Sequence, residues 1–193
     1  MGAMNAFLEH LTRSNSTPRA AIDAATATVG TAGRSLRFAA ALGAGCAGGV
    51  FFAFSSFIMK ALKDLPDSQG IAAMQSINRA APTPLFMGVL FGTAIVGVAL
   101  GVNAARNMDQ AGSHWVVIGA ALYLVGIIVT AAYHVPHNDA LARLDANDIS
   151  SADAWHSYLR NWTAWNHVRM LTSLGGAASF VLAAVAARPS ARI

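Results

Sequence analysis

The residues best suited to do chemistry in this chain lie together in a short polar run at the edge of an apolar segment. Asn166, His167 and Arg169 stand immediately before residues 170–187, which contain no charged side chain. An imidazole can remove a proton near neutral pH, and a fixed guanidinium with amide donors can stabilise the anion that remains. Polar groups beside hydrocarbon are costly unless they are paired or used. The run therefore predicts a site for proton abstraction from a lipophilic molecule.

A second polar group lies at the end of an earlier apolar stretch. Asn138 and Asp139 come shortly after Pro136, and we expect this proline to break the helix there. If the apolar helices pack side by side, this turn lies at the same membrane face as residues 166–169. The two groups would then border an internal cavity. The residues that we predict to contact a substrate in it are Asn78, Arg79, Trp165, Ser55 and His137.

The elements that must hold these groups are long apolar helices. The chain has 193 residues, of which 55% are hydrophobic and 11% are charged, whereas soluble domains have about a quarter charged residues. Four stretches lack Asp, Glu, Lys and Arg, and each can supply most or all of the roughly 20 residues that cross a bilayer core. They predict an all-α bundle of four transmembrane helices, with spans at about 36–59, 82–105, 112–134 and 167–187.

Polar segments complete the expected organisation. Residues 1–35 form a polar segment that we expect to lie on the membrane surface or to be partly disordered, and residues 188–193 form a short tail. Each of the two long loops is expected to contain an amphipathic interfacial helix. One face of the second of these helices is an aromatic stripe, which is typical of membrane anchors: Trp155, Tyr158, Leu159 and Trp162. Polar residues repeat on another face: His156, Arg160, Thr163 and His167.

The distribution of positive charge bears on localisation and partners. Seven Lys and Arg residues lie on the side of the two termini and the short loop, against six in the two long loops, so the positive-inside rule favours cytoplasmic termini. We expect a multi-pass protein of the plasma (inner) membrane whose partners are membrane lipid and a lipophilic small molecule. The charge is spread along the chain and no nucleic-acid motif is present, so nucleic acid is not expected as a partner. A homo-oligomer remains open.

Four segments of the sequence carry a resemblance to a known family. They are GVFFAFS at 49–55, MQSINR at 74–79, VPHND at 135–139 and WTAWNHVR at 162–169. They resemble the DUF1772, or anthrone oxygenase-like, integral membrane proteins, over about residues 36–187. The resemblance implies an enzyme that oxidises an anthrone to an anthraquinone with molecular oxygen and without a metal or flavin cofactor. It also implies a polar site around Asn138, Asp139, Asn166, His167 and Arg169.

The first hypothesis is therefore a cofactor-independent oxygenase or related oxidoreductase that acts on a lipophilic aromatic, anthrone- or hydroquinone-like substrate. His167 is the expected base, and Asp139 is expected to orient it. The anion would be stabilised by Arg169, Asn166 and Asn138.

Two alternatives stand beside this hypothesis. His134 and His137 depart from the family pattern, in which an amide and an aliphatic residue are commoner, and this departure weakens the case for an anthrone substrate. A transition metal such as Cu, Fe or Zn could bind to a set of histidines, with Asp139 also available: His134, His137, His156 and His167. A non-catalytic membrane scaffold or accessory protein is the other alternative. The sequence has no nucleotide-binding loop, paired-cysteine or GxSxG motif, so hydride transfer with a bound dinucleotide is not expected.

Overall fold

The computed structural model describes residues 30–187, and every regular element among them is a helix. The chain divides into two units, Met1–Leu36 and Arg37–Ile193. In the first unit the described residues, 30–36, are helical, so the predicted polar segment at 1–35 falls largely outside the described part of the chain. The predicted tail at 188–193 lies wholly outside it. The elements that surround the site all belong to the second unit.

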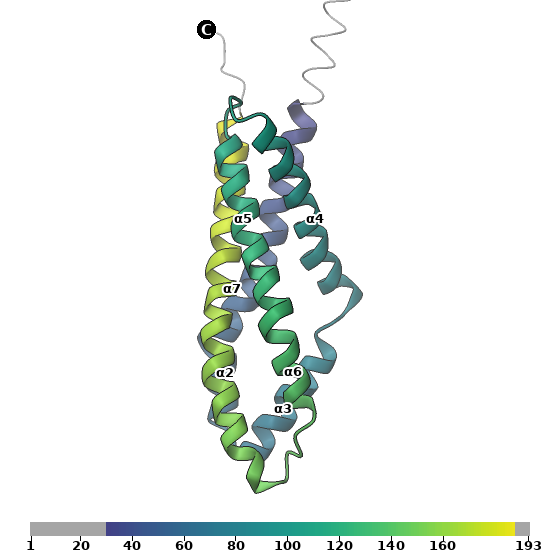
Figure 1. The fold of residues 1–193 in the computed structure, drawn as a ribbon, viewed down its shortest axis with the longest axis vertical. Coiled ribbons are helices and arrows are strands. Elements are labelled where there is room, and N and C mark those ends of the chain that lie inside the picture. The colour runs from purple at the N-terminus through teal and green to yellow at the C-terminus, as the bar shows by residue number, and fades with distance from the viewer. Residues whose placement is uncertain (1–29, 188–193) are drawn as a thin grey trace, which may run out of the picture. The chain divides into compact units, whose positions relative to one another are not determined.

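Four of the described helices are long and apolar enough to cross a membrane: Gly30–Lys63, Pro84–Arg106, Ser113–Ala142 and Ile149–Ala186. Each of them overlaps one predicted span, and the prediction of an all-α chain with four candidate transmembrane helices is confirmed. In the second unit, α4 (Pro84–Arg106), α5 (Ser113–Val129) and α7 (Ala152–Ala186) run in alternating directions, and α5 packs against both of the others (Figure 1). These features indicate a multi-pass membrane protein.

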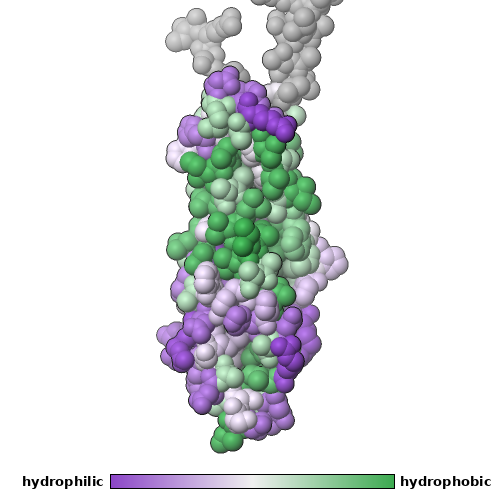
Figure 2. All heavy atoms as spheres, in the orientation of Figure 1, coloured by the Kyte–Doolittle hydropathy of each residue, from purple (hydrophilic) through white to green (hydrophobic). Residues whose placement is uncertain are grey.

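Apolar side chains cover the outside of this bundle over part of its length. Figure 2 shows, on one face, a band of hydrophobic residues with hydrophilic residues on either side of it. The large apolar side chains that remain exposed include Phe52, Phe91, Ile95, Ile128, Leu171 and Val181. A band of this kind is expected where lipid replaces water. The helix Ile149–Ala186 has 38 residues and is about 57 Å long, so it extends well beyond a hydrocarbon core of about 30 Å.

The second predicted interfacial helix is instead the first half of α7. The helix runs without a break from Ala152 to Ala186, because no proline or glycine precedes Gly175 in it to interrupt the backbone hydrogen bonds. Trp155 and Trp162 are 0% and 3% exposed and pack in a protein core. They are therefore core residues, and the prediction that they anchor the chain in the membrane interface is wrong.

The first long loop contains a separate helix, α3 (Asp67–Ala80), whose apolar side chains join the same core. Ile71 and Met74 are both buried, at 1% and 0% exposure. They cover the aromatic stripe of α7, which explains why that stripe does not face lipid. Two short elements complete the core: α2 (Met59–Lys63), which continues the first long helix after the π-helical turn η1 (Phe54–Ile58), and α6 (Val135–Ala142).

Pro136 does not break its helix, so the prediction that the helix ends at this proline is wrong. The helix α5 passes through the π-helical turn η2 (Thr130–His134) directly into α6. A proline has no N–H and its ring clashes with the carbonyl four residues earlier, and the wider π turn relieves that conflict. Asn138 and Asp139 consequently lie inside a helix, where Asn138 is half-buried and Asp139 is exposed.

The helices α5 and α7 approach closely where Gly119 faces Gly176. A Cβ atom at either position would lie 3.1–3.2 Å from the other glycine's carbonyl oxygen. Small residues of this kind allow helix backbones to pack tightly within a membrane. One turn further along α5, the hydroxyl of Tyr123 donates to the carbonyl oxygen of Leu90 in α4, at 3.0 Å. These contacts fix α4, α5 and α7 against one another.

Candidate functional site

A cavity of about 280 Å³ lies among the first long helix, α3, α4, α6 and α7. This volume is at the lower end of the range for small-molecule sites, roughly 300–1,000 Å³. Its wall is mostly apolar. Val50, Phe91 and Val135 line it and are also 39%, 51% and 49% exposed, so they form an apolar rim. The polar side chains that line the cavity are Asn78, Thr130, His134, Asn138 and Arg169.

Arg169 brings a positive charge to this cavity. The residue is 7% exposed, and its guanidinium carbon lies 4.1 Å from the centre of the Phe51 ring and 5.3 Å from that of the Trp162 ring. Aromatic faces stabilise a cation that has lost its water. Within residues 30–187 no carboxylate forms an ion pair with Arg169. The cavity is therefore electropositive, and an anionic ligand would neutralise a charge that the protein leaves unbalanced.

Asn166 holds this guanidinium in place from outside the cavity. The residue is 0% exposed, and its Oδ1 accepts hydrogen bonds from Nη2 and Nε of Arg169, at 2.7 and 3.2 Å. Its Nδ2 donates to the carbonyl oxygen of Phe51 and to Oγ of Ser55, both at 2.8 Å. Nη1 of Arg169 donates to Oγ1 of Thr130, at 3.4 Å. Asn166 thus orients the charge, and remaining N–H groups of Arg169 are available to a ligand.

His134 supplies the imidazole of the cavity. Its side chain is 1% exposed and packs edge-on against Trp162, with 4.8 Å between ring centres. Nδ1 lies 3.4 Å from the carbonyl oxygen of Val129, and a carbonyl can only accept, so this contact places the ring proton on Nδ1. Nε2 then has a lone pair, and it is buried without a hydrogen-bond partner among the described residues. Such a nitrogen can accept a proton from a bound molecule.

Polar groups from three helices meet at Asn138. Its Oδ1 accepts hydrogen bonds from the hydroxyl of Tyr158, at 2.8 Å, and from Nε1 of Trp162, at 2.9 Å. Nδ2 of Asn78, in α3, lies 3.5 Å from the same tyrosine hydroxyl. Because two donors fix the oxygen of Asn138, its amide nitrogen is the atom left to donate to a ligand in the cavity.

The structure keeps several of the predicted site residues away from the cavity. His167 and Asp139 are exposed, and neither of them lines it. His167 lies on another face of α7, in a separate groove beside α2. Arg79 is exposed next to Asn78, and Ser55 lines the same groove as His167. The structure therefore brings Asn138, Arg169 and Asn78 to one cavity, with Asn166 directly behind it.

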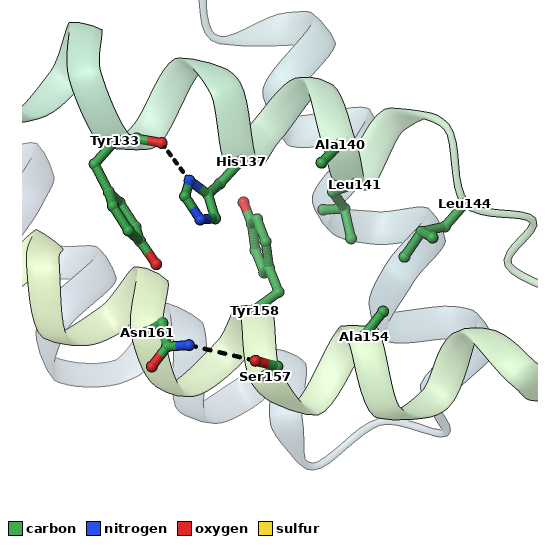
Figure 3. Close-up of a pocket in the computed structure, with 9 residues that line it drawn as sticks. All are labelled: Tyr133, His137, Ala140, Leu141, Leu144, Ala154, Ser157, Tyr158 and Asn161. Atoms are coloured by element: carbon green, nitrogen blue, oxygen red, sulfur yellow. Dashed lines mark hydrogen bonds between the residues drawn. The ribbon is translucent and has the colours of Figure 1, made fainter.

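His137 lies at a different hollow, between α6 and α7, which Figure 3 shows. Its ring stacks on that of Tyr133, with 3.9 Å between centres, and its Nδ1 lies 2.7 Å from the carbonyl oxygen of Tyr133. Trp165 packs against the same tyrosine ring, at 5.3 Å. Both predicted contact residues are thus held by Tyr133 outside the cavity.

The four histidines of the alternative metal site are dispersed. His134 lines the cavity and His137 stacks on Tyr133, as described above. His156 pairs with Asp67, with 3.2 Å between Nε2 and Oδ2, and His167 lies in the outer groove. In the part of the chain that the structure describes, no group of three or more His, Cys, Asp or Glu side chains is placed to hold a metal ion.

One repeat explains which side chains of α7 face the protein interior. Buried residues alternate at spacings of four and three along the helix: Trp155, Leu159, Trp162, Asn166, Arg169, Ser173, Gly176, Phe180 and Ala183. This spacing is that of a helix packed along a continuous seam. His167 falls outside the repeat. The signal is present in the sequence, since extending the aromatic stripe beyond Trp162 places Asn166 and Arg169 inside.

Comparison with known proteins bears on the same helices. Residues 85–179 match the family model described as Anthrone oxygenase, and this segment includes α4, α5, α6 and most of α7, with His134, Asn138 and Arg169. No curated protein and no solved structure matches the chain. The predicted resemblance is confirmed over residues 85–179, which match the model of the anthrone oxygenase family.

Proposed function

We propose that this protein is a membrane oxidoreductase that uses molecular oxygen to oxidise a lipophilic phenol or anthrone-like compound in the cavity. One observation supports this function above others. Arg169, a buried cation without a carboxylate partner in residues 30–187, shares an apolar cavity with the unpaired Nε2 of His134. A deprotonated phenol or anthrone is a flat aromatic anion, so it suits both the apolar wall and the positive charge. Membership of the family over residues 85–179 supports the same chemistry.

The first step is removal of an acidic C–H or O–H proton from the substrate. Nε2 of His134 accepts that proton, and the negative charge gathers on the substrate oxygen. Arg169 and the amide nitrogen of Asn138 donate to this oxygen, and donors fixed in a dry cavity stabilise a developing charge most effectively. We assign the base to His134 instead of His167 because His134 lines the cavity and His167 does not.

The second step is oxidation of the resulting carbanion by molecular oxygen. For an anthrone, the ring CH₂ carbon forms a bond to one oxygen atom, and the proton held by His134 completes a hydroperoxide. Cleavage of the O–O bond with loss of the remaining hydrogen on that carbon releases water and leaves a carbonyl group. The sum is anthrone plus O₂ giving anthraquinone plus water, with His134 returned to its neutral state.

The apolar rim supports a substrate that arrives from the bilayer. Val50, Phe91 and Val135 line the cavity and are partly exposed. All three lie inside charge-free stretches of the sequence, Val50 in 38–59, Phe91 in 80–105 and Val135 in 110–138. A lipophilic aromatic compound concentrates in this region, so it could enter without crossing water.

The test is oxygen uptake by the purified protein with an anthrone or a hydroquinone as substrate. We expect His134→Gln to lower turnover by about 10²–10⁴-fold, the usual contribution of a general base, and Arg169→Met to lower it by about 10²-fold or more. His114→Gln is the matched control, because His114 is exposed at the start of α5 and does not line the cavity.

Two results would contradict the proposal. If His167→Gln abolished turnover while His134→Gln retained it, the base would be assigned wrongly. If the wild-type protein consumed no oxygen with either class of substrate, the oxidase function itself would be wrong, and the scaffold alternative would gain support.

A further inference from the structure

A second site lies in a groove between α2 and the first half of α7, on another face of α7 from the cavity. The groove has a volume of about 530 Å³. Lys60 and Lys63 of α2 and Arg160 of α7 line it, and His156 and His167 also contribute to its wall. We propose that this groove binds the phosphate of an anionic membrane phospholipid.

The charge of the groove is the first argument. Lys60, Lys63 and Arg160 are exposed, and none of them forms an ion pair with another residue in the described range 30–187. No carboxylate lines the groove. One carboxylate lies against the groove wall, that of Asp67, which pairs with His156. Lys60, Lys63 and Arg160 line the hollow without such a partner and repel one another, and an anion placed between them removes that repulsion.

The helical register is the second argument, because it directs the cations into the groove from both sides. Lys60 and Lys63 are three residues apart and so lie on one face of α2. On α7, His156, Arg160, Thr163 and His167 recur at spacings of four, three and four. All six of these residues line the groove. The polar face of α7 that this repeat creates therefore forms one wall of the groove.

The position of the groove relative to the apolar stretches favours a lipid over a soluble anion. Lys60 is the first charged residue after the stretch 38–59, and His167 stands just before the stretch 170–187. One end of the groove thus lies at the level where both helices leave hydrocarbon, which is the level of lipid phosphates. Basic pockets between membrane helices bind anionic headgroups, and Arg160 can donate two parallel hydrogen bonds to a phosphate.

The wall of the groove also offers the apolar surface that a lipid requires. Met59, Leu159 and Ala164 line it together with the cations, and Ser55 and Thr163 add hydroxyl groups near the membrane end. A glycerol backbone and the first carbons of an acyl chain would contact these side chains. Inorganic phosphate would use only the cations.

The experiment is native mass spectrometry of the full chain in a neutral detergent. The probes are dioctanoyl phosphatidylglycerol, dioctanoyl phosphatidylcholine and inorganic phosphate. The groove variant is K60Q/R160Q, and the matched control is R106Q/R143Q, which removes the same charge from exposed arginines that do not line the groove. Wild type and control are expected to bind phosphatidylglycerol in preference to phosphatidylcholine.

We expect about a fivefold loss of phosphatidylglycerol affinity for each cation removed, hence about 25-fold for K60Q/R160Q and about fivefold for K63Q alone. Equal losses in K60Q/R160Q and R106Q/R143Q would show general attraction to anionic lipid and overturn the site. Displacement of phosphatidylglycerol by inorganic phosphate at a comparable concentration would overturn the lipid and indicate a soluble anion. All outcomes are independent of oxygen uptake, because none of the five substituted residues lines the cavity.

Discussion

Replacing Asn166 and Arg169 singly and together measures how far the buried charge depends on the amide behind it. In Asn166→Ala, the guanidinium loses an oxygen that accepts two of its hydrogen bonds, at 2.7 and 3.2 Å, and it remains buried against Phe51. Hydrogen bonds to a charged group contribute about 1.5–3 kcal/mol each. We therefore expect this substitution to lower the free energy of unfolding by about 3–5 kcal/mol.

Arg169→Met removes the charge and keeps much of the apolar volume of the side chain. It leaves the neutral Oδ1 of Asn166 without donors, which costs about 1–3 kcal/mol, and it removes the long hydrogen bond to Oγ1 of Thr130. In the double variant no charge is left unpaired. The double variant is therefore expected to be more stable than the sum of the two single changes by about 1.5–3 kcal/mol. Ordinary hydrogen bonds within membrane proteins give an average coupling of only about 0.6 kcal/mol. The size of the coupling therefore distinguishes a buried charge stabilised by Asn166 from an ordinary hydrogen bond.

The assay is equilibrium unfolding in mixed micelles of neutral detergent and dodecyl sulfate, followed by the fluorescence of the four tryptophans. Arg160→Met with Asn161→Ala is the matched control, because these two exposed residues of the same helix lie at adjacent positions that do not face each other. The control pair is expected to be additive within about 0.5 kcal/mol. A coupling near 0.6 kcal/mol or below for Asn166 and Arg169 would refute the argument that the amide stabilises a buried charge.

Two further predictions concern the fold. Gly176→Ala is expected to destabilise the protein by about 1–3 kcal/mol in the same assay, because its Cβ would lie 3.1 Å from the carbonyl oxygen of Gly119. Gly92→Ala is the control, because a Cβ atom there meets no atom within 4 Å. Equal losses of stability in the two variants would contradict the tight crossing of α5 and α7. Hydrogen bonds from Ser150 lower the pKa of Asp148 below its ordinary value of 3.8. The ionised Asp148 therefore contributes stability that is complete above pH 3.8 and is lost as the pH falls through the lowered pKa. Asp148→Ala is expected to remove this part of the loss of stability in acid, measured by unfolding between about pH 2 and 5. An unchanged dependence of stability on pH in this range would contradict the prediction.

The four spans could be predicted from the sequence because hydrocarbon excludes charge. A residue such as Lys60 or Arg106 marks the end of an apolar stretch on composition alone, and each of the four stretches overlaps one long apolar helix. The contacts between polar side chains could not be predicted in the same way, because they depend on how each helix is rotated about its own axis. Composition contains no information about that rotation.

The aromatic stripe of α7 shows why helical periodicity alone does not distinguish a membrane anchor from a core residue. Trp155 and Trp162 at helical spacing suit a membrane interface and a protein core equally well. The choice depends on whether another element covers the stripe, and α3 does so with Ile71 and Met74. That helix is distant in the sequence, so its position could not be read from the stripe itself.

The second half of the site depends on the π-helical turn. Tyr123 and Thr130 are seven residues apart and both face inward, and the same spacing would bring His137 inward next. The turn Thr130–His134 holds an extra residue, which shifts the register by one position. Asn138 lines the cavity as a result, and His137 lies outside it. No propensity rule marks this turn in advance, although Pro136 gives a physical reason for it.

The polar run at residues 161–169 therefore serves two separate places. Neighbouring residues on an α-helix point about 100° apart, so Asn166 and His167 cannot both face one cavity while α7 remains straight. Asn166 belongs to the seam that holds Arg169, and His167 belongs to the outer groove. The division has a consequence for the proposed reaction, because a base that faces the cavity would come from a different helix. We propose His134 for that role; it lies in the π-helical turn before α6, lines the cavity and contacts the Trp162 ring.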